Sequence, residues 1–175
     1  MTTQIILAGF GGQGILFAGK LLAYAGMLKG KEVSWLPSYG PEMRGGTANC
    51  NVIISDEPIA SPIIQKPDAL IALNLPSLEK FEKSVAETGK IYYDSSLISK
   101  TPDSDAQAFA IPATQMAIDM NANTLANMVT LGKFAKETGV ITLDEMKSAL
   151  EKLVPPKKAA LLEVNKKALD AGYNL

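Results

Sequence analysis

Ile5-Ile6-Leu7-Ala8-Gly9-Phe10-Gly11-Gly12-Gln13-Gly14 joins a short apolar run to a glycine-rich turn near the start of the chain. Four consecutive apolar residues are typical of a strand that is buried on both faces of a parallel sheet. The mostly apolar residues 15–28 follow the turn and are followed by Gly30, which predicts a helix. Residues 32–36 supply a second strand, so the opening of the chain predicts a βαβ unit.

The rest of the chain repeats the alternation of strand and helix patterns. Thr142-Leu143-Asp144-Glu145 is a capping box that starts a further helix. Strands are predicted at 48–54, 69–73, 90–93 and 108–111, and helices at 77–88, 113–120, 124–138 and about 157–171. This order predicts an α/β fold: a single Rossmann-like domain over residues 1–175, with a largely parallel sheet flanked by helices.

The composition narrows the classes of function. The 175 residues are 47% hydrophobic, and 17 Lys and Arg against 18 Asp and Glu give a formal net charge of -1, so no nucleic-acid partner and no membrane is expected. The absence of histidine excludes histidine general-base chemistry, and the single cysteine, Cys50, cannot hold an iron–sulfur cluster alone. The amino terminus lacks the pattern of a signal peptide, so we expect a cytoplasmic protein.

The glycine turn is the first candidate binding site. Gly9, Gly11 and Gly14 match the G-x-G-x-x-G spacing between a strand and a helix, where backbone N–H groups can receive a phosphate. Gly12 and Gln13 complete the candidate set. The alternative is that these glycines only allow the strand and the helix to pack closely.

Two nucleotide-binding interpretations of this region are disfavoured. A nicotinamide site places an acidic residue at the end of the second strand, where this chain has Trp35-Leu36-Pro37. Residues 14–20 match the G-x-x-x-x-G-K pattern, but Leu21 replaces the hydroxyl residue that ligates magnesium, and the intervening residues continue a buried helix.

Residues 37–47 form the second candidate segment, Pro37-Ser38-Tyr39-Gly40-Pro41-Glu42-Met43-Arg44-Gly45-Gly46-Thr47. It follows the second strand at its carboxyl end, which is the edge where ligands bind in open parallel sheets. The Arg44 guanidinium can present five donors to a carboxylate or a phosphate. The candidate binding residues here are Tyr39, Glu42, Arg44, Gly45 and Gly46; the alternative is a surface turn with solvated charges.

These segments carry a resemblance to a known family. The glycine turn, the block from Trp35 to Cys50, the run Pro67-Asp68-Ala69-Leu70-Ile71-Ala72-Leu73-Asn74 and residues 127–132 are similar to the gamma subunit of 2-oxoacid:ferredoxin (acceptor) oxidoreductases. The similarity covers most of the chain and is greatest for the 2-oxoglutarate and branched-chain 2-oxoacid branches. It implies that residues 1–175 are one pyruvate/ketoisovalerate oxidoreductase gamma-type domain.

The resemblance implies a subunit of a multisubunit enzyme that decarboxylates a 2-oxoacid and delivers the acyl group to coenzyme A. Thiamine diphosphate, magnesium and iron–sulfur clusters are expected on partners: thiamine-diphosphate-binding alpha and beta subunits, and a ferredoxin-like delta subunit or an external ferredoxin. This chain is expected to hold none of these groups and to carry no catalytic residue by itself. Coenzyme A is its candidate ligand, at the glycine turn and the Arg44 segment.

Two other functions stay open at this point. A purely structural assembly subunit would also explain the glycines, and a stand-alone NAD(P)-binding reductase is less favoured. Three further residues have simpler interpretations: Cys50 as a buried apolar residue, Asn127 as a buried hydrogen-bonding or interface residue, and Asp94 as a residue of a turn and helix cap.

Overall fold

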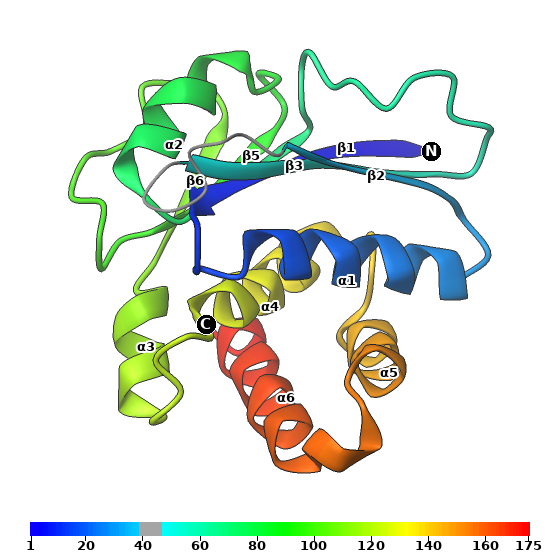
Figure 1. Cartoon of the computed structure of the whole chain (residues 1–175). Coiled ribbons are helices and arrows are strands. Elements are labelled where there is room, and N and C mark those ends of the chain that lie inside the picture. Colours follow the sequence, from blue (N-terminus) through cyan, green and yellow to red (C-terminus); the bar gives the residue numbers. More distant parts are fainter. Residues whose placement is uncertain (39–46) are drawn as a thin grey trace.

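The fold is a six-stranded sheet covered by helices on both faces (Figure 1). The computed structural model describes residues 1–38 and 47–175. The strand order is β2-β3-β1-β4-β5-β6. The strands are β1 (Thr2–Phe10), β2 (Glu32–Ser38), β3 (Thr47–Ser55), β4 (Ala69–Ala72), β5 (Lys90–Asp94) and β6 (Gln107–Ile111).

The helices divide between the two faces of the sheet. The larger layer, below the sheet in Figure 1, contains α1, α4, α5 and α6, while α2 lies on the opposite face. The helices are α1 (Ile15–Leu28), α2 (Leu75–Phe81), α3 (Ala113–Asp119), α4 (Ala126–Thr138), α5 (Leu143–Leu153) and α6 (Ala159–Tyr173), with short 3₁₀ turns at Glu82–Ser84 and Pro156–Lys158. None of these helices is long and apolar enough to cross a membrane.

Strand β1 explains why the sheet needs cover on both sides. Ile5 and Leu7 belong to the core beneath the larger helix layer, whereas Ile6 belongs to the second core around α2. Successive side chains of a strand point to opposite faces, so the apolar run of β1 contributes to both cores. The predicted α/β fold with flanking helices is therefore confirmed.

The predicted βαβ unit is present as β1, α1 and β2, but its two strands are not neighbours. β3 lies between β1 and β2 and runs antiparallel to both. β3 pairs with the whole of β1, from Thr2↔Ser55 to Phe10↔Thr47, which is the longest ladder in the sheet. β1, β4, β5 and β6 pair in parallel, so the sheet is mixed.

The bounds predicted for the helix at 77–88 are wrong, since α2 spans Leu75–Phe81. Asn74 caps α2, because its Oδ1 accepts a hydrogen bond from the N–H of Ser77, and the helix therefore begins at Leu75. It ends at Phe81, and Val85 is already extended. The capping box at Thr142 is confirmed, since Thr142 and Glu145 exchange both expected hydrogen bonds at the start of α5.

Helices α4 and α6 approach each other closely through two glycines. A Cβ atom on Gly132 would collide with the backbone of Leu169 and Tyr173, and one on Gly172 would collide with the backbone carbonyl of Val129. Backbone atoms cannot move aside as a flexible side chain can, so both positions require glycine at this crossing. The contact fixes α4 in the helix layer beside α1.

Candidate functional site

The carboxyl ends of five strands meet at one edge of the sheet. β1, β4, β5 and β6 run parallel, and β2 has the same direction because β3 runs antiparallel to both β1 and β2. The glycine turn, residues 9–14, follows β1 at this edge and leads into α1. This is the edge of an open α/β sheet at which ligands bind.

Two glycines of the turn adopt backbone conformations that other residues rarely adopt. Gly12 has φ 97° and is exposed, and a Cβ there would meet no atom of the described residues within 4 Å. Gly14 has φ 71° and is the N-cap residue of α1. Gly14 has no side chain and the first turn of α1 has no acidic residue, so within residues 1–38 and 47–175 no side chain caps this helix end. The free N–H groups and the helix dipole favour an anion here.

Gln13 holds the turn against the sheet. Its Oε1 accepts a hydrogen bond from the N–H of Phe10 at 2.6 Å, and its Nε2 donates to the carbonyl oxygen of Leu73 at 3.0 Å. The side chain therefore ties the turn to the end of the neighbouring strand β4. Each amide atom has one partner here, so Gln13 positions the turn, and its role as a binding residue stays a prediction.

Asn127 holds the other end of the turn. This buried residue lies in the first turn of α4, and its Nδ2 donates to the carbonyl oxygen of Gly14 at 3.0 Å. A Cβ on Gly14 would collide with the same Nδ2. The prediction of Asn127 as a buried hydrogen-bonding residue is confirmed, and its partner is the glycine turn.

The second candidate segment lies partly outside the described residues. Tyr39, Glu42, Arg44, Gly45 and Gly46 are all in the range 39–46, so their role stays a prediction. Its two flanks are described. Thr47 pairs with Phe10 at the end of β1, and Ser38 pairs with Asn49 of β3. The segment thus leaves and re-enters the sheet at the edge that carries the glycine turn.

A cavity of about 400 Å³ opens beside the glycine turn. Its walls come from the turn and α1, from the segment before α4, and from the junction of α5 and α6. The residues that line it are Gly12, Gly14, Phe17, Thr124, Leu125, Asn127, Leu153, Val154, Pro155, Lys158, Leu161 and Asn165. The volume lies within the ~300–1,000 Å³ typical of small-molecule sites, and the mixture of apolar walls with a few polar groups is also typical.

The sequence identified only some of the residues that line this cavity. Gly12, Gly14 and Asn127 were singled out, whereas Lys158 and Asn165 were not. Both lie in the carboxyl-terminal helical region, more than 140 residues from the turn in sequence. Their local pattern is that of an amphipathic helix, which carries no signal of a ligand.

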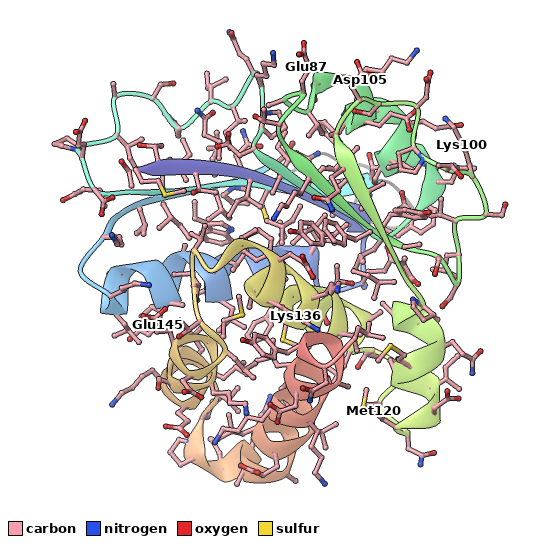
Figure 2. The ribbon with its side chains drawn as sticks, turned by 180° about the vertical axis from the view of Figure 1, so that it is seen from behind. Glu87, Lys100, Asp105, Met120, Lys136 and Glu145 are labelled. Atoms are coloured by element: carbon pink, nitrogen blue, oxygen red, sulfur yellow. The ribbon has the colours of Figure 1, made fainter. Side chains whose placement is uncertain are left out.

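A larger hollow of about 520 Å³ lies at the opposite edge of the sheet. Its lining includes Glu87 and Asp105, which Figure 2 shows at the top of the molecule, away from the large helix layer. Lys83 in its wall forms an ion pair with Asp103 at 3.1 Å. Because these residues precede β5 and β6 and their charges are mixed, this hollow lies at the amino ends of the strands and is the weaker candidate.

Asp94 stabilises a turn and a helix start, as its interpretation as a turn and cap residue predicts. This buried carboxylate accepts hydrogen bonds from the N–H groups of Ser96 and Thr114, at 3.1 and 3.2 Å, and from the Thr114 hydroxyl. It thereby fixes the turn after β5 and the start of α3.

Cys50 is a buried residue, as predicted, and burial raises the pKa of its thiol to about 12 from the ordinary 9.0. We expect no reaction with a maleimide or an aromatic disulfide reagent at pH 8 in the native chain and full reaction in denaturant, because a shift of about three units lowers the thiolate fraction about a thousandfold. Thiol titration at pH 8 checks this expectation, and rapid labelling without denaturant would contradict it.

The raised pKa of Cys50 also makes stability depend on pH. The thiol ionises at a lower pH in the unfolded chain than in the folded chain, so its contribution to stability is present below about pH 9 and is lost as the pH rises toward 12.

The fold and the site define a class of protein: an α/β domain with a glycine turn, an uncapped helix terminus and a cavity together at the carboxyl edge of its sheet. Residues 4–175 match the family model of pyruvate ferredoxin/flavodoxin oxidoreductases. The chain belongs to this family, and the resemblance seen in the sequence is confirmed.

Individual relatives agree with the family. The chain is 37% identical over 179 residues to the 2-oxoglutarate synthase subunit KorC of Methanocaldococcus jannaschii, covering 100% of this chain and 94% of that protein. It is 40% identical over 171 residues to the ketoisovalerate oxidoreductase subunit VorA of Methanothermobacter thermautotrophicus, covering 97% of this chain and 35% of VorA. The chain therefore spans about a third of the length of VorA.

A solved structure extends the comparison to a complex with ligands. The 2-oxoglutarate:ferredoxin oxidoreductase of Magnetococcus marinus, solved with 2-oxoglutarate, coenzyme A and succinyl-CoA, is similar with a TM-score of 0.89 and 26% identity. The match covers 99% of this chain and 30% of that chain. The same fold thus forms one part of a larger oxidoreductase polypeptide.

Proposed function

We propose that this chain is the gamma-type subunit of a 2-oxoacid:ferredoxin oxidoreductase and supplies its coenzyme A side, or the wall between subunits next to that side. The reaction is the oxidative decarboxylation of a 2-oxoacid to its acyl-CoA, with 2-oxoglutarate favoured as substrate. Support comes from the family match, from the KorC relative, and from the similar oxidoreductase that was solved with 2-oxoglutarate and coenzyme A bound. Residues 1–175 would act as one domain of the assembly.

The observation that carries the proposal is the uncapped amino terminus of α1 at the glycine turn. Coenzyme A is a polyanion with a long neutral arm, so a site for it needs donors for phosphate next to a less polar channel. The free N–H groups at Gly14 and the first turn of α1 supply the donors, and the cavity begins at Gly12 and Gly14. Arg44 and its neighbours Tyr39, Glu42, Gly45 and Gly46 are proposed to complete the site from the second segment.

The residues of this chain do not fit the other groups that the reaction needs. Its single cysteine is buried with a raised pKa, whereas an iron–sulfur cluster needs several accessible thiolates. We therefore place the clusters and thiamine diphosphate with its magnesium on the alpha, beta and delta-type partners or an external ferredoxin. Thiamine diphosphate supplies the electron sink for decarboxylation when it is bound there.

One observation favours the alternative that this chain is a purely structural assembly subunit. Gly14 is required by its contact with Asn127, so the glycine turn would be needed for packing even without a ligand. At the exposed Gly12 the positive φ, and no contact with another described residue, accounts for glycine, so close packing of strand and helix does not explain this position. A nicotinamide site is disfavoured further, since Glu32 begins β2 at the edge away from the glycine turn.

Reconstitution tests the proposal. We expect the purified chain alone to show no 2-oxoacid oxidation, and a complex assembled anaerobically from the partner subunits to need this chain for turnover that depends on coenzyme A. The assay follows reduction of ferredoxin or a viologen dye with the oxoacid and coenzyme A varied separately. Turnover in the isolated chain, or an unchanged KM for coenzyme A in a complex without it, would overturn the proposal.

A further inference from the structure

Part of the β2–β3 pair turns its side chains away from α1. Cys50 of β3 faces α1, because a Cβ on Gly19 of that helix would meet its sulfur atom. Successive side chains of a strand point to opposite faces, so Asn49 and Asn51 point away from α1. Leu36 of β2 pairs with Asn51, and paired residues of antiparallel strands share a face, so Leu36 points the same way.

The described residues cover this side of the sheet only in part. α2 packs against β1 and β4 (Figure 1), and residues 57–61 share a hollow with Ile53 and Ser55 beside the amino end of β1. Toward the carboxyl edge, Leu36 is 40% exposed, and Asn49 and Asn51 are half-buried. These three residues therefore belong to a surface that the described part of the chain leaves open.

Phe10 extends this surface to the carboxyl edge. It stands at an alternate position of β1 from Ile6, which belongs to the core around α2, so Phe10 points to the side of α2. Its side chain is 40% exposed, and it directly precedes Gly11 of the glycine turn. We call this surface the open face; its residues are Phe10, Leu36, Asn49 and Asn51.

The open face has the composition of a protein interface. It combines two large apolar side chains with two carboxamides and carries no charge, and the only charged residue of β2, Glu32, lies at the far end of the strand. The buried centres of interfaces are depleted of charge and contain aromatic and apolar anchors. A solvated edge strand, in contrast, usually carries charged side chains. Because a sheet face is flat, whereas small-molecule sites are concave, the open face suits a protein partner.

The relatives indicate which protein this partner is. The same fold makes up 35% of VorA and 30% of the Magnetococcus marinus chain, whereas KorC is matched over 94% of its length. The fold thus occurs both alone and within a polypeptide about three times as long. A separate chain of this length must hold by association what VorA holds in one polypeptide.

We propose that the open face docks the oxidoreductase subunit that is equivalent to the remaining part of VorA. The inference rests on the proposed function and names the surface that joins the two chains. Docking buries Leu36 and Phe10 and gives the carboxamides of Asn49 and Asn51 partners on the other subunit. Because Phe10 adjoins the glycine turn, the docked subunit borders the candidate site.

A charge placed on the open face tests the inference. We expect Leu36→Lys to weaken binding of this chain to the other purified subunits roughly tenfold or more, because the ammonium group must lose its water in the interface. The matched control is Leu28→Lys, the same change at a leucine that is 48% exposed at the end of α1, on the other side of the sheet. Anaerobic titration calorimetry measures both affinities, and thermal melting of the free variants shows that they fold.

Hydroxyl-radical footprinting of the native chain gives a test that needs no substitution. Oxidation of Leu36 and Phe10 should fall several-fold on assembly, while oxidation of Met27 and Leu28, which are 49% and 48% exposed, stays unchanged. Equal protection of the two pairs would overturn the inference. Protection of Leu36 and Phe10 in the free monomer, or only when the free chain dimerises, would assign the open face to this chain or to a second copy and also overturn it.

The remaining outcomes separate this inference from the proposed function. Equal affinities of the Leu36 and Leu28 variants for the partner subunits, with turnover still dependent on this chain, would overturn the docking face and leave the proposed function intact. At saturating concentrations of Leu36→Lys, turnover should return to the native rate, since the substitution acts on association. No binding of the native chain to the partner subunits would remove both.

Discussion

Gly14→Ala is expected to lower the free energy of unfolding by about 2–5 kcal/mol and to impair turnover of the assembled enzyme. The left-handed backbone at φ 71° costs a residue with a Cβ about 1–2 kcal/mol. The new methyl group collides with Asn127 Nδ2, and displacing a buried side chain adds about 1–3 kcal/mol. The hydrogen bond from Asn127 to the Gly14 carbonyl would be distorted, so the donors at the start of α1 would shift.

Gly139→Ala is the matched control for this prediction. Gly139 also has a positive φ, 62°, but a Cβ there meets nothing within 4 Å, and it ends α4 at the far end from Asn127. We expect a loss of about 1 kcal/mol and native turnover. Chemical denaturation and steady-state kinetics on both variants give the comparison. Equal effects of the two substitutions would show that backbone strain alone, without the Asn127 contact, explains the cost.

Gly172→Ala is expected to cost about 3 kcal/mol, although alanine normally improves a helix by about 1 kcal/mol over glycine. The added Cβ meets the backbone carbonyl of Val129, so α4 and α6 must separate. Because Asn127 lies in the first turn of α4, the separation should also disturb the glycine turn. Urea unfolding with comparison of midpoints and slopes measures the loss of stability.

Gly26→Ala is the control for Gly172→Ala, because its added Cβ meets side-chain atoms and not backbone atoms. Gly26 lies within α1, and its added Cβ would meet Val33 Cγ1 at 2.9 Å and Ile54 Cγ2 at 3.3 Å. Side chains can adjust by a few tenths of an ångström, and the helix gains propensity, so we expect stability within about 1 kcal/mol of native. A Gly172→Ala variant as stable as Gly26→Ala would contradict the required close approach of α4 and α6.

Local patterns predicted the elements because each pattern depends on nearby residues. The apolar run at Ile5 gave β1, and the Thr142 capping box gave the start of α5. The direction of β3 could not be predicted, since a strand has the same side-chain period whether it pairs parallel or antiparallel. The end of α2 was missed because the sequence pattern continued to Thr88, whereas the backbone becomes extended at Val85.

Only the part of the candidate site that depends on nearby residues could be predicted from the sequence. The glycine turn is a local motif, and its position after a buried strand located the carboxyl edge. The contact of Gly14 with Asn127 joins residues 113 positions apart, and the cavity adds Asn165 from a third element. Such contacts depend on how the helices stack, which no short stretch of sequence encodes.

The reversed direction of β3 has a consequence for redesigning specificity. β2 and β3 form an antiparallel pair. Residues 39–46 join the two strands between Ser38 and Thr47, and Glu32 pairs with Ser55 at the other end of the pair. Both anchor points belong to continuous ladders, so residues 39–46 can be exchanged as a cassette between relatives without altering the register of β1 and β3. Grafting this cassette alone would transplant the candidate residues Tyr39, Glu42, Arg44, Gly45 and Gly46 while the scaffold stays native.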